Sequence, residues 1–480
     1  MILVVGNGMA GHRLAQGLRR RNSDLPVTVL GAEPRPAYNR VLLSAVLAGT
    51  TTPEALELPD PGVEVRLDAR VVGIDTRARR VTLADDETLG YDETLGYDEL
   101  VLATGSRATL PPIEGLAGPD GTPADGVVTF RTMADCGRIA ELARGGPMAV
   151  LGGGLLGVEA ARGLAGLGVD VTVVHPVGHL MERQLDPGAG GVLARVLSGV
   201  GVEFRLATGA TSWQPGRLTL SDGSALDVAG LVVTAGVAPQ TWLARSAGLR
   251  VERGIVVDDR MATSVPGVHA IGECAEHRGR CQGLVGPCWE QADVLADLLS
   301  GADPAARYTG SAMITRLKAR DVDLAAMGSL DEGPDVEVVR VSDAARGRYG
   351  AVAVRDGRIA GAVLLGLPDA TGPVIQLHDS GAPAPADRFS LLLGRVTPAT
   401  TDSPAQLPAR AVVCRCNGVT KGELVAAWRC GSRDVAALAV GTRATTGCGS
   451  CAGVVEGLCH WLDETDPEPE MSSAEQEGAA

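Results

Sequence analysis

Four cysteines near the C-terminal end of the chain are spaced C-x-C-x31-C-x2-C, as the ligands of a metal centre often are. They are Cys414, Cys416, Cys448 and Cys451. Two close thiolate pairs can each bind one iron of a [2Fe–2S] cluster, which needs four sulfur ligands. A structural four-cysteine zinc site is the alternative, but zinc ribbons usually repeat a C-x2-4-C pair in both halves. The spacing therefore favours a redox-active iron–sulfur site.

Two glycine-rich loops lie upstream of these cysteines, each between a strand-like run and a helix-like run. In the first loop, Gly6 allows a tight turn, Gly8 lets the backbone approach a pyrophosphate and Gly11 lets the helix pack on the strand. The second loop repeats these glycines as Gly152, Gly154 and Gly157. The helices that follow would offer backbone N–H groups and a positive dipole end to phosphate. Their first residues are Met9, Ala10, Leu155 and Leu156. Each loop predicts a dinucleotide site.

The residues that would bind ribose differ between the two loops. Glu33 follows the second strand of the first unit and is placed to accept hydrogen bonds from ribose hydroxyls. At the corresponding point of the second unit the chain has His175 and Pro176, and no arginine follows until Arg183. A carboxylate there would favour the free 2′-hydroxyl of NADH, whereas an imidazole discriminates only weakly. The pattern favours NADH and leaves NADPH open.

The order of elements predicts an α/β chain with two doubly wound, Rossmann-like domains, because strand, glycine turn, helix and second strand occur twice. Apolar strands at 230–239 and 267–273 indicate that the chain returns to the first domain after completing the second. We therefore expect the first nucleotide domain at 1–115 and 236–305, with the second inserted at 116–235.

The remainder of the chain has a different pattern. Residues 308–395 contain antiparallel strand signals with an Asp356-Gly357 hairpin turn, which predict a small α+β domain. A Pro/Thr/Ala-rich linker is expected at 397–410, followed by a small helical cysteine module at 411–462. Residues 463–480 are acidic and contain little to bury, so we expect a disordered tail there.

Composition excludes several classes of function. The net charge of −15 argues against nucleic-acid binding. Met1 leads directly into an apolar strand without a charged leader, and no apolar run is long enough to cross a bilayer. We therefore expect a cytoplasmic protein without a membrane contact. In that compartment ten cysteines are more often thiols or metal ligands than disulfides.

The motifs together resemble the two-dinucleotide flavoprotein reductase family. They are GNGMAG at 6–11, Glu33, YNRVLLS at 38–44, ATG at 103–105, GGGLLGVE at 152–159, TAGVAP at 234–239 and GEC at 272–274. The resemblance implies that the first loop binds FAD and the second NAD(P)H. It further implies cofactor contacts by Arg40, Thr104, Gly105, Glu159, Gly236, Gly272 and Glu273. Glu159 would position the nicotinamide amide, and Glu273 replaces the usual aspartate near the flavin ribityl and phosphate groups.

Thiol chemistry beside the flavin is not expected. Where one subgroup of this family carries a redox cysteine, the chain has Ser44, which cannot form a mixed disulfide. Cys274, Cys281 and Cys288 recur every seven residues and could form a second metal site, but buried packing thiols are the favoured interpretation. Hydride transfer between stacked rings needs no side-chain acid or base, so no catalytic residue is predicted.

The C-terminal cysteine module resembles bacterioferritin-associated-ferredoxin-like domains. The whole order is similar to the N-terminal part of assimilatory nitrite reductase large subunits and to the electron-transfer subunits of bacterial assimilatory nitrate reductases. That resemblance implies electron flow from NAD(P)H through FAD and [2Fe–2S] to a separate molybdenum-containing nitrate reductase subunit, because no sirohaem domain follows Cys451. Two alternatives remain open. One is a reductase for a nitrite or sulfite reductase or an oxygenase in another chain; the other is a redox sensor that docks a partner.

Overall fold

The structure is a computed structural model that describes residues 1–84, 93–395, 407–409, 411–447, 449 and 451–466; the other residues lie outside the description. Two compact units are present, Met1–Val396 and Thr397–Ala480. None of the helices in the described ranges has the length and apolar character needed to span a bilayer.

The first unit begins with a parallel five-stranded sheet of order β19-β7-β1-β2-β3. Its strands are β1 Ile2–Val5, β2 Val27–Leu30, β3 Glu64–Arg66, β7 Glu99–Leu102 and β19 Val268–Ala270. All four residues of β1 are buried, as expected for a parallel strand covered on both faces. The late strand β19 pairs with β7, so the chain returns to this sheet after a long excursion.

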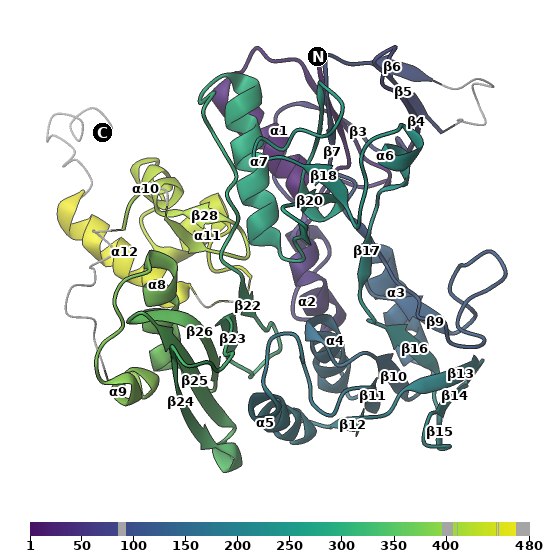
Figure 1. The fold of residues 1–480 in the computed structure, drawn as a ribbon, viewed down its shortest axis with the longest axis vertical. Helices are drawn as coiled ribbons and strands as arrows, with labels where there is room; N and C mark the ends of the chain where they lie inside the picture. Colours follow the sequence, from purple (N-terminus) through teal and green to yellow (C-terminus); the bar gives the residue numbers. More distant parts are fainter. Residues whose placement is uncertain (85–92, 396–406, 410, 448, 450, 467–480) are drawn as a thin grey trace, which may run out of the picture. The chain divides into compact units, whose positions relative to one another are not determined.

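Two helices from opposite ends of this domain lie side by side (Figure 1). They are α1 Met9–Arg21 and α7 Val285–Ser300. Arg13 on α1 forms an ion pair of 3.0 Å with Asp293 on α7, and Arg21 forms one of 2.6 Å with Asp297. These ion pairs attach α7 to α1, the helix that follows the first glycine turn.

The excursion builds a second parallel sheet of order β12-β11-β10-β16-β9. Its strands are β9 Val127–Thr129, β10 Met148–Leu151, β11 Val171–His175, β12 Val202–Leu206 and β16 Gly230–Val233, and its helices are α3 Met133–Ala143, α4 Leu155–Gly166 and α5 Pro187–Ser198. The predicted fold class, with two Rossmann-like sheets, is confirmed. The two segments that connect the sheets, β8 Ser106–Ala108 and β17 Val237–Pro239, pair antiparallel with each other.

Smaller elements accompany the two parallel sheets. They are β4 Val71–Asp75, β5 Arg80–Leu83 and β6 Thr94–Gly96; β13 Ala210–Gln214, β14 Arg217–Leu220 and β15 Ala225–Asp227; β18 Ile255–Val257, β20 Ala275–His277 and β21 Arg280–Cys281; and the short helices α2 Leu43–Leu47 and α6 Trp242–Ser246. Helix α2 packs on α4, and its apolar residues share the core of the second sheet, whereas the first sheet has a core of its own with α1 and α7.

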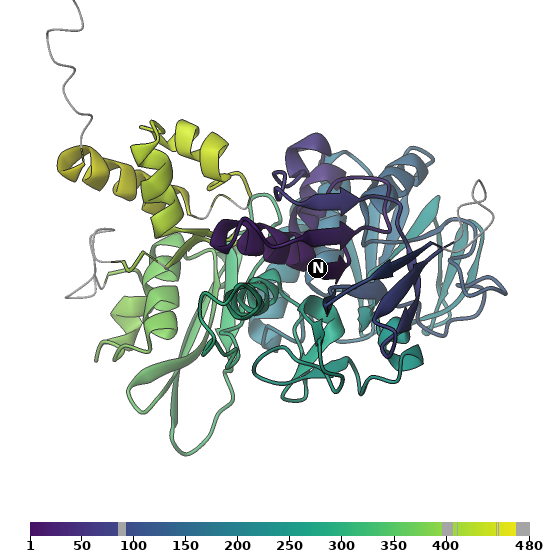
Figure 2. The ribbon, with the colours of Figure 1, turned by 90° about the horizontal axis from the view of Figure 1, so that it is seen from above.

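The last part of the first unit is an antiparallel sheet of order β22-β23-β26-β25-β24 with a helix against β26 (Figures 1 and 2). Its elements are β22 Ile314–Arg316, β23 Leu324–Gly328, β24 Val336–Asp343, β25 Arg348–Arg355, β26 Arg358–Leu365, α8 Pro368–Ser380 and α9 Arg388–Leu392. Asp356 and Gly357 connect β25 to β26 with φ of 51° and 70°, as a type I′ turn requires. The predicted hairpin is present.

The second unit contains a two-stranded ribbon and three helices: β27 Val412–Cys414, β28 Val419–Thr420, α10 Lys421–Arg429, α11 Val435–Thr442 and α12 Ala452–Thr465. Thr420 and Glu423 form the predicted capping box of α10. Helix α12 continues past the expected boundary at residue 462. Its following residue, Asp466, accepts hydrogen bonds from Trp428 Nε1 at 3.0 Å and from Arg429 Nε at 2.7 Å. The first residues assigned to the acidic tail therefore belong to the folded module. The rest of that tail and most of the predicted linker lie outside the described residues.

Replacing Gly137 by alanine is expected to stabilise the first unit by about 0.5–1 kcal/mol, because glycine loses more backbone entropy in a helix than alanine. Gly137 lies on the exposed side of α3, and a Cβ atom there would meet no heavy atom within 4 Å. Thermal unfolding would show the gain. The control is Gly163→Ala in α4, whose Cβ would lie 3.3 Å from that of Ala48 and should remove the gain. A lower melting temperature for Gly137→Ala would contradict the prediction.

Candidate cofactor sites

The first glycine loop has a backbone that a side chain would obstruct. Gly6 adopts φ of 120°, and a Cβ on Gly6 would overlap the carbonyl oxygen of Ala103. A Cβ on Gly11 would overlap the Gly6 carbonyl oxygen, so this glycine sets the close approach of α1 to β1. Gly8 is the N-cap of α1, has no side-chain cap and is open around its Cβ position. The N-terminus of α1 and its first residues, Met9 and Ala10, can therefore bind phosphate through backbone N–H groups.

Glu33, which is expected to bind the ribose of FAD, is paired with an arginine. Glu33 forms an ion pair with Arg40 and accepts a 2.9 Å hydrogen bond from the Tyr38 hydroxyl. The Arg40 guanidinium lies 4.7 Å from the centre of the Tyr38 ring. Burial raises the pKa of Tyr38 to about 12, so this hydroxyl remains a donor at neutral pH. The group can present one carboxylate and one guanidinium to a dinucleotide.

Arg131 is a functional candidate that the sequence interpretation missed. It forms an ion pair with Glu273, which also accepts a 2.5 Å hydrogen bond from Ser106. Arg131 lies between β9 and α3, directly after the strand-like run VVTF at 127–130. This position at the end of a strand is the only local signal of its role. The pair places a second guanidinium beside the segment that rejoins the first sheet.

Thr104 and Gly105 lie where the chain leaves the first sheet, and Gly272 lies where it rejoins that sheet. The Thr104 hydroxyl donates to the Gln240 carbonyl at 2.8 Å, and Gly105 adopts φ of 67°. The Gly272 N–H donates to Gln291 Oε1 at 2.8 Å. The Gln291 amide nitrogen is buried without a hydrogen-bond partner among the described residues. Together with the open N-cap at Gly8 and the close backbone approach at Gly6 and Gly11, these residues fit the pyrophosphate of FAD.

The second loop repeats the geometry of the first. Gly152 adopts φ of 118°, and its Cβ would lie 2.8 Å from the Thr234 carbonyl oxygen. A Cβ on Gly157 would overlap the Gly152 carbonyl oxygen, and Gly154 is the open N-cap of α4. Leu155 and Leu156 form the first turn of that helix. Gly236, with φ of 105°, accepts a hydrogen bond from Thr109 N–H where the two connecting segments meet.

Glu159 is buried between three parts of the first unit. Its carboxylate accepts 2.9 Å hydrogen bonds from the Ser44 hydroxyl and from the Lys318 backbone N–H, and Lys318 Nζ lies 3.8 Å away. Lys318 comes from the α+β domain and had no sequence signal. A buried carboxylate with these partners can also accept a hydrogen bond from an amide.

The substitution Glu159→Gln is expected to raise the KM for NADH about tenfold, because a charge-assisted acceptor for the nicotinamide amide becomes neutral. Flavin content should be retained, since Glu159 lies in the second nucleotide domain. Steady-state NADH oxidation with ferricyanide measures the change. Glu141→Gln on the exposed part of α3 serves as control and should leave KM unchanged. An unaltered KM in Glu159→Gln would remove Glu159 from the nicotinamide site.

His175 does not present a free ring nitrogen to a ribose. Its Nδ1 accepts from Gly153 N–H at 3.1 Å, and its Nε2 lies 3.1 Å from Glu182 Oε2. The residue is 4% exposed. The structure thus places a carboxylate, Glu182, at the point where sequence interpretation found only an imidazole.

Three of the four predicted cluster ligands belong to the buried core of the second unit. Cys414, Cys416 and Cys451 are buried, the Cys414 and Cys416 sulfur atoms are 3.7 Å apart, and Cys451 interacts with Cys414. Cys448 lies outside the described residues, and no metal-binding group of three or more His, Cys, Asp or Glu residues is present in the part that is described.

Local backbone geometry favours thiolate ligands in this module. A Cβ on Gly447 would overlap the Cys416 sulfur atom, so glycine allows the backbone to approach that sulfur closely. Cys451 is the N-cap of α12, at the positive end of the helix dipole. The helix dipole favours negative charge on the Cys451 sulfur, and the buried, closely spaced thiols fit an iron–sulfur cluster.

The remaining buried thiols have the environment of packing residues. The Cys274 thiol donates to the Ile271 carbonyl at 3.2 Å, and the Cys288 thiol donates to the Leu284 carbonyl at 3.2 Å. Burial raises the pKa of both thiols, and it raises that of Cys136 to about 12. Neutral thiols are poor nucleophiles and poor ligands. These environments favour the packing interpretation.

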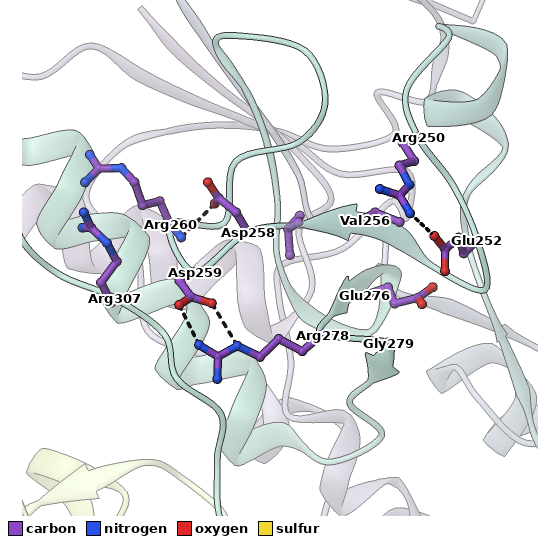
Figure 3. A pocket seen from close by; sticks show the side chains of 11 residues that line it. Arg250, Glu252, Val256, Asp258, Asp259, Arg260, Glu276, Arg278, Gly279 and Arg307 are labelled. Atoms are coloured by element: carbon purple, nitrogen blue, oxygen red, sulfur yellow. Dashed lines mark hydrogen bonds and ion pairs between the residues drawn. The ribbon is translucent and has the colours of Figure 1, made fainter.

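A separate hollow of about 550 Å³ lies near β18 and β20 and is lined mainly by charged side chains (Figure 3). Two of its four arginines pair with carboxylates of the same pocket: Arg278 with Asp259 at 2.7 Å, and Arg250 with Glu252 at 2.5 Å. No lining residue belongs to either glycine loop. This pocket is therefore distinct from the candidate dinucleotide sites.

Family models match most of the chain. Residues 1–292 match the pyridine nucleotide-disulphide oxidoreductase model. The chain belongs to this family. Residues 314–369 match the rubredoxin NAD+ reductase C-terminal domain, and residues 412–460 match the BFD-like [2Fe-2S] binding domain. The predicted enzyme class and cofactors are confirmed: the chain is an NAD(P)H-dependent oxidoreductase with FAD and a [2Fe–2S] domain.

Individual family members agree with this assignment. The chain is 36% identical over 473 residues to a nitrite reductase (NAD(P)H) of Bacillus subtilis, covering 95% of this chain and 57% of that protein. It is 35% identical to the assimilatory nitrate reductase electron transfer subunit of the same organism, covering 97% and 60%. The chain thus spans less than two thirds of these relatives. The covalent putidaredoxin reductase–putidaredoxin complex matches with a TM-score of 0.72 at 25% identity, covering 82% of this chain and 96% of the matched chain. The predicted resemblance is confirmed.

Proposed function

We propose that this chain takes electrons from NADH at the second glycine loop and delivers them, through FAD at the first loop and the cluster of the second unit, to a separate protein. The observation that carries the proposal is the presence in one chain of two matching dinucleotide loops and a module with Cys414 and Cys416 sulfur atoms 3.7 Å apart. NADH supplies a hydride, an iron–sulfur cluster accepts single electrons, and a flavin can connect the two kinds of transfer.

In this proposal the protein's residues bind and orient, and none acts as a general acid or base. Gly8 and Gly154 open the helix N-termini to phosphate. Arg40 and Arg131 supply positive charge, and Glu159 supplies an amide acceptor. Position 44 is a serine and not a cysteine, and its hydroxyl donates to Glu159, so disulfide substrates are not expected.

For the acceptor we propose a molybdenum-containing nitrate reductase catalytic subunit, on the similarity to the Bacillus subtilis electron transfer subunit over 97% of this chain. The comparable similarity to a nitrite reductase supports a second candidate, electron delivery to nitrite. Docking to a catalytic partner is expected to be transient. We also propose a cytoplasmic location, since none of the described cysteines forms a disulfide.

The first test is an anaerobic NADH titration of the purified protein, followed by visible absorbance and EPR. Flavin bleaching together with a rhombic reduced [2Fe–2S] signal supports the proposal. Bleaching without that signal, combined with bound zinc, would show that the second unit carries no electrons.

The second test concerns the acceptor. NADH-driven nitrate reduction that requires both this chain and an added molybdenum subunit supports the nitrate assignment. Equal electron delivery to an unrelated oxygenase, with none to nitrate reductase, would reject it. Nitrite consumption with a sirohaem partner, in place of nitrate consumption, would favour the second candidate.

A further inference from the structure

A turn after β11 carries a carboxylate to the edge of the second glycine loop. Glu182 lies in the turn at 181–184, and its Oε2 atom is 3.1 Å from Nε2 of His175, the last residue of β11. In a βαβ nucleotide site the ribose of the adenosine is bound beside the carboxyl end of this second strand. Glu182 therefore reaches the position at which an acidic residue selects the coenzyme.

Gly153 holds this turn through both of its backbone groups. Its N–H donates to His175 Nδ1 at 3.1 Å, and its carbonyl accepts from Met181 N–H at 2.9 Å. A Cβ on Gly153 would lie 2.8 Å from both the His175 ring and the Leu180 side chain. Since Gly153 is part of the phosphate loop, the position of the turn is coupled to that of the loop.

Apolar packing fixes the turn on the side opposite Glu182. Leu180 and Met181 are fully buried, and Leu185 is 4% exposed. Met181 adopts φ of 54°, which a β-turn or loop residue accepts only when its surroundings hold it there. The Glu182 side chain, in contrast, is 33% exposed and can contact a ligand. The turn is thus a rigid support for one accessible carboxylate.

The same hydrogen bonds define the role of His175. Because Gly153 N–H donates to Nδ1, the proton of the neutral imidazole is on Nε2 and is donated to Glu182. Both ring nitrogens are occupied and the ring is buried, so His175 is a positioning residue. It orients the carboxylate of Glu182.

We propose that Glu182 selects NADH over NADPH, with His175 positioning it. The carboxylate would accept a hydrogen bond from the free 2′-hydroxyl and repel a 2′-phosphate. This inference rests on the proposed function, which requires a nicotinamide coenzyme at the second loop. Arg183, the neighbouring residue, would attract a 2′-phosphate once Glu182 is neutral.

The test uses the FAD-loaded full chain with the substitution Glu182→Gln, which keeps an acceptor for His175 and removes the charge. Stopped-flow flavin reduction gives the concentration dependence for NADH and for NADPH. The preference for NADH over NADPH is expected to fall at least about tenfold, through the half-saturating concentration and not the limiting rate. His175→Phe should lower the preference by a smaller factor, with flavin content retained.

Glu203→Gln is the matched control, because Glu203 lies on the neighbouring strand β12 with a side chain 69% exposed. It should leave the preference unchanged. An unchanged preference in Glu182→Gln, or a wild-type preference for NADPH, would overturn the inference while leaving the reductase function intact. Failure of both coenzymes to reduce the wild-type flavin would overturn the inference and the proposed function together.

Discussion

Replacing Cys451 by serine is expected to reduce electron delivery to a separate acceptor protein at least about 100-fold, because substitutions even in the outer shell of a metal site cost 10–100-fold. Cys451 is 5% exposed, interacts with Cys414 and caps α12. Serine is a poorer ligand for iron than thiolate, so the cluster should be lost or incompletely assembled.

Two measurements separate loss of the cluster from general damage. Iron and acid-labile sulfide content and the EPR signal should fall in Cys451→Ser. NADH–ferricyanide activity should stay within about twofold of the wild type, because both glycine loops belong to a different compact unit with its own core.

Cys430→Ser is the control in the same module. Cys430 is exposed at the end of α10 and lies outside the four-cysteine pattern, so this variant should keep a full cluster. A rhombic signal of wild-type intensity in Cys451→Ser would contradict the ligand assignment. Loss of the signal in Cys430→Ser as well would point to misfolding of the module and leave Cys451 without a specific role.

The substitution Gly11→Ala is expected to give a protein that is purified with less than about a tenth of its FAD and is destabilised by about 2–3 kcal/mol, in the range of other overpacked sites. The new Cβ would overlap the Gly6 carbonyl oxygen and lie 3.4 Å from the Ala103 Cβ. The obstructing atom belongs to the backbone and cannot rotate away, so α1 must move away from β1. Its N-terminus would then move out of the phosphate site.

Gly157→Ala is the matched comparison, because its Cβ would overlap the Gly152 carbonyl oxygen in the same way. It should retain FAD and lose NADH-dependent flavin reduction. The ratio of flavin to protein absorbance, thermal unfolding and stopped-flow reduction by NADH distinguish the two variants. Full flavin content in Gly11→Ala, or flavin loss in Gly157→Ala, would contradict the assignment of the first loop to FAD and the second to NADH.

The parts of the site that could be predicted from the sequence are those whose residues lie within a few positions of one another along the chain. The glycine loops and the cysteine pairs are readable because their chemistry requires particular residues within a few positions of one another. The hairpin at Asp356 and Gly357 and the capping box of α10 are readable for the same reason. The boundary of the cysteine module was less accurate, because the bonds of Asp466 to Trp428 and Arg429 span 37–38 residues.

The sequence by itself thus determined the fold class, the two dinucleotide loops and the four cysteines, since each is encoded by local pattern. Only the tertiary structure decided which charged groups meet. Arg131 reaches Glu273 across 142 residues, Lys318 reaches Glu159 across 159, and Glu182 turns back to His175 at the end of β11. The physical reason is that these pairs form where separate strands and turns are packed together. The spacing of residues along the chain does not predict which of these side chains come into contact.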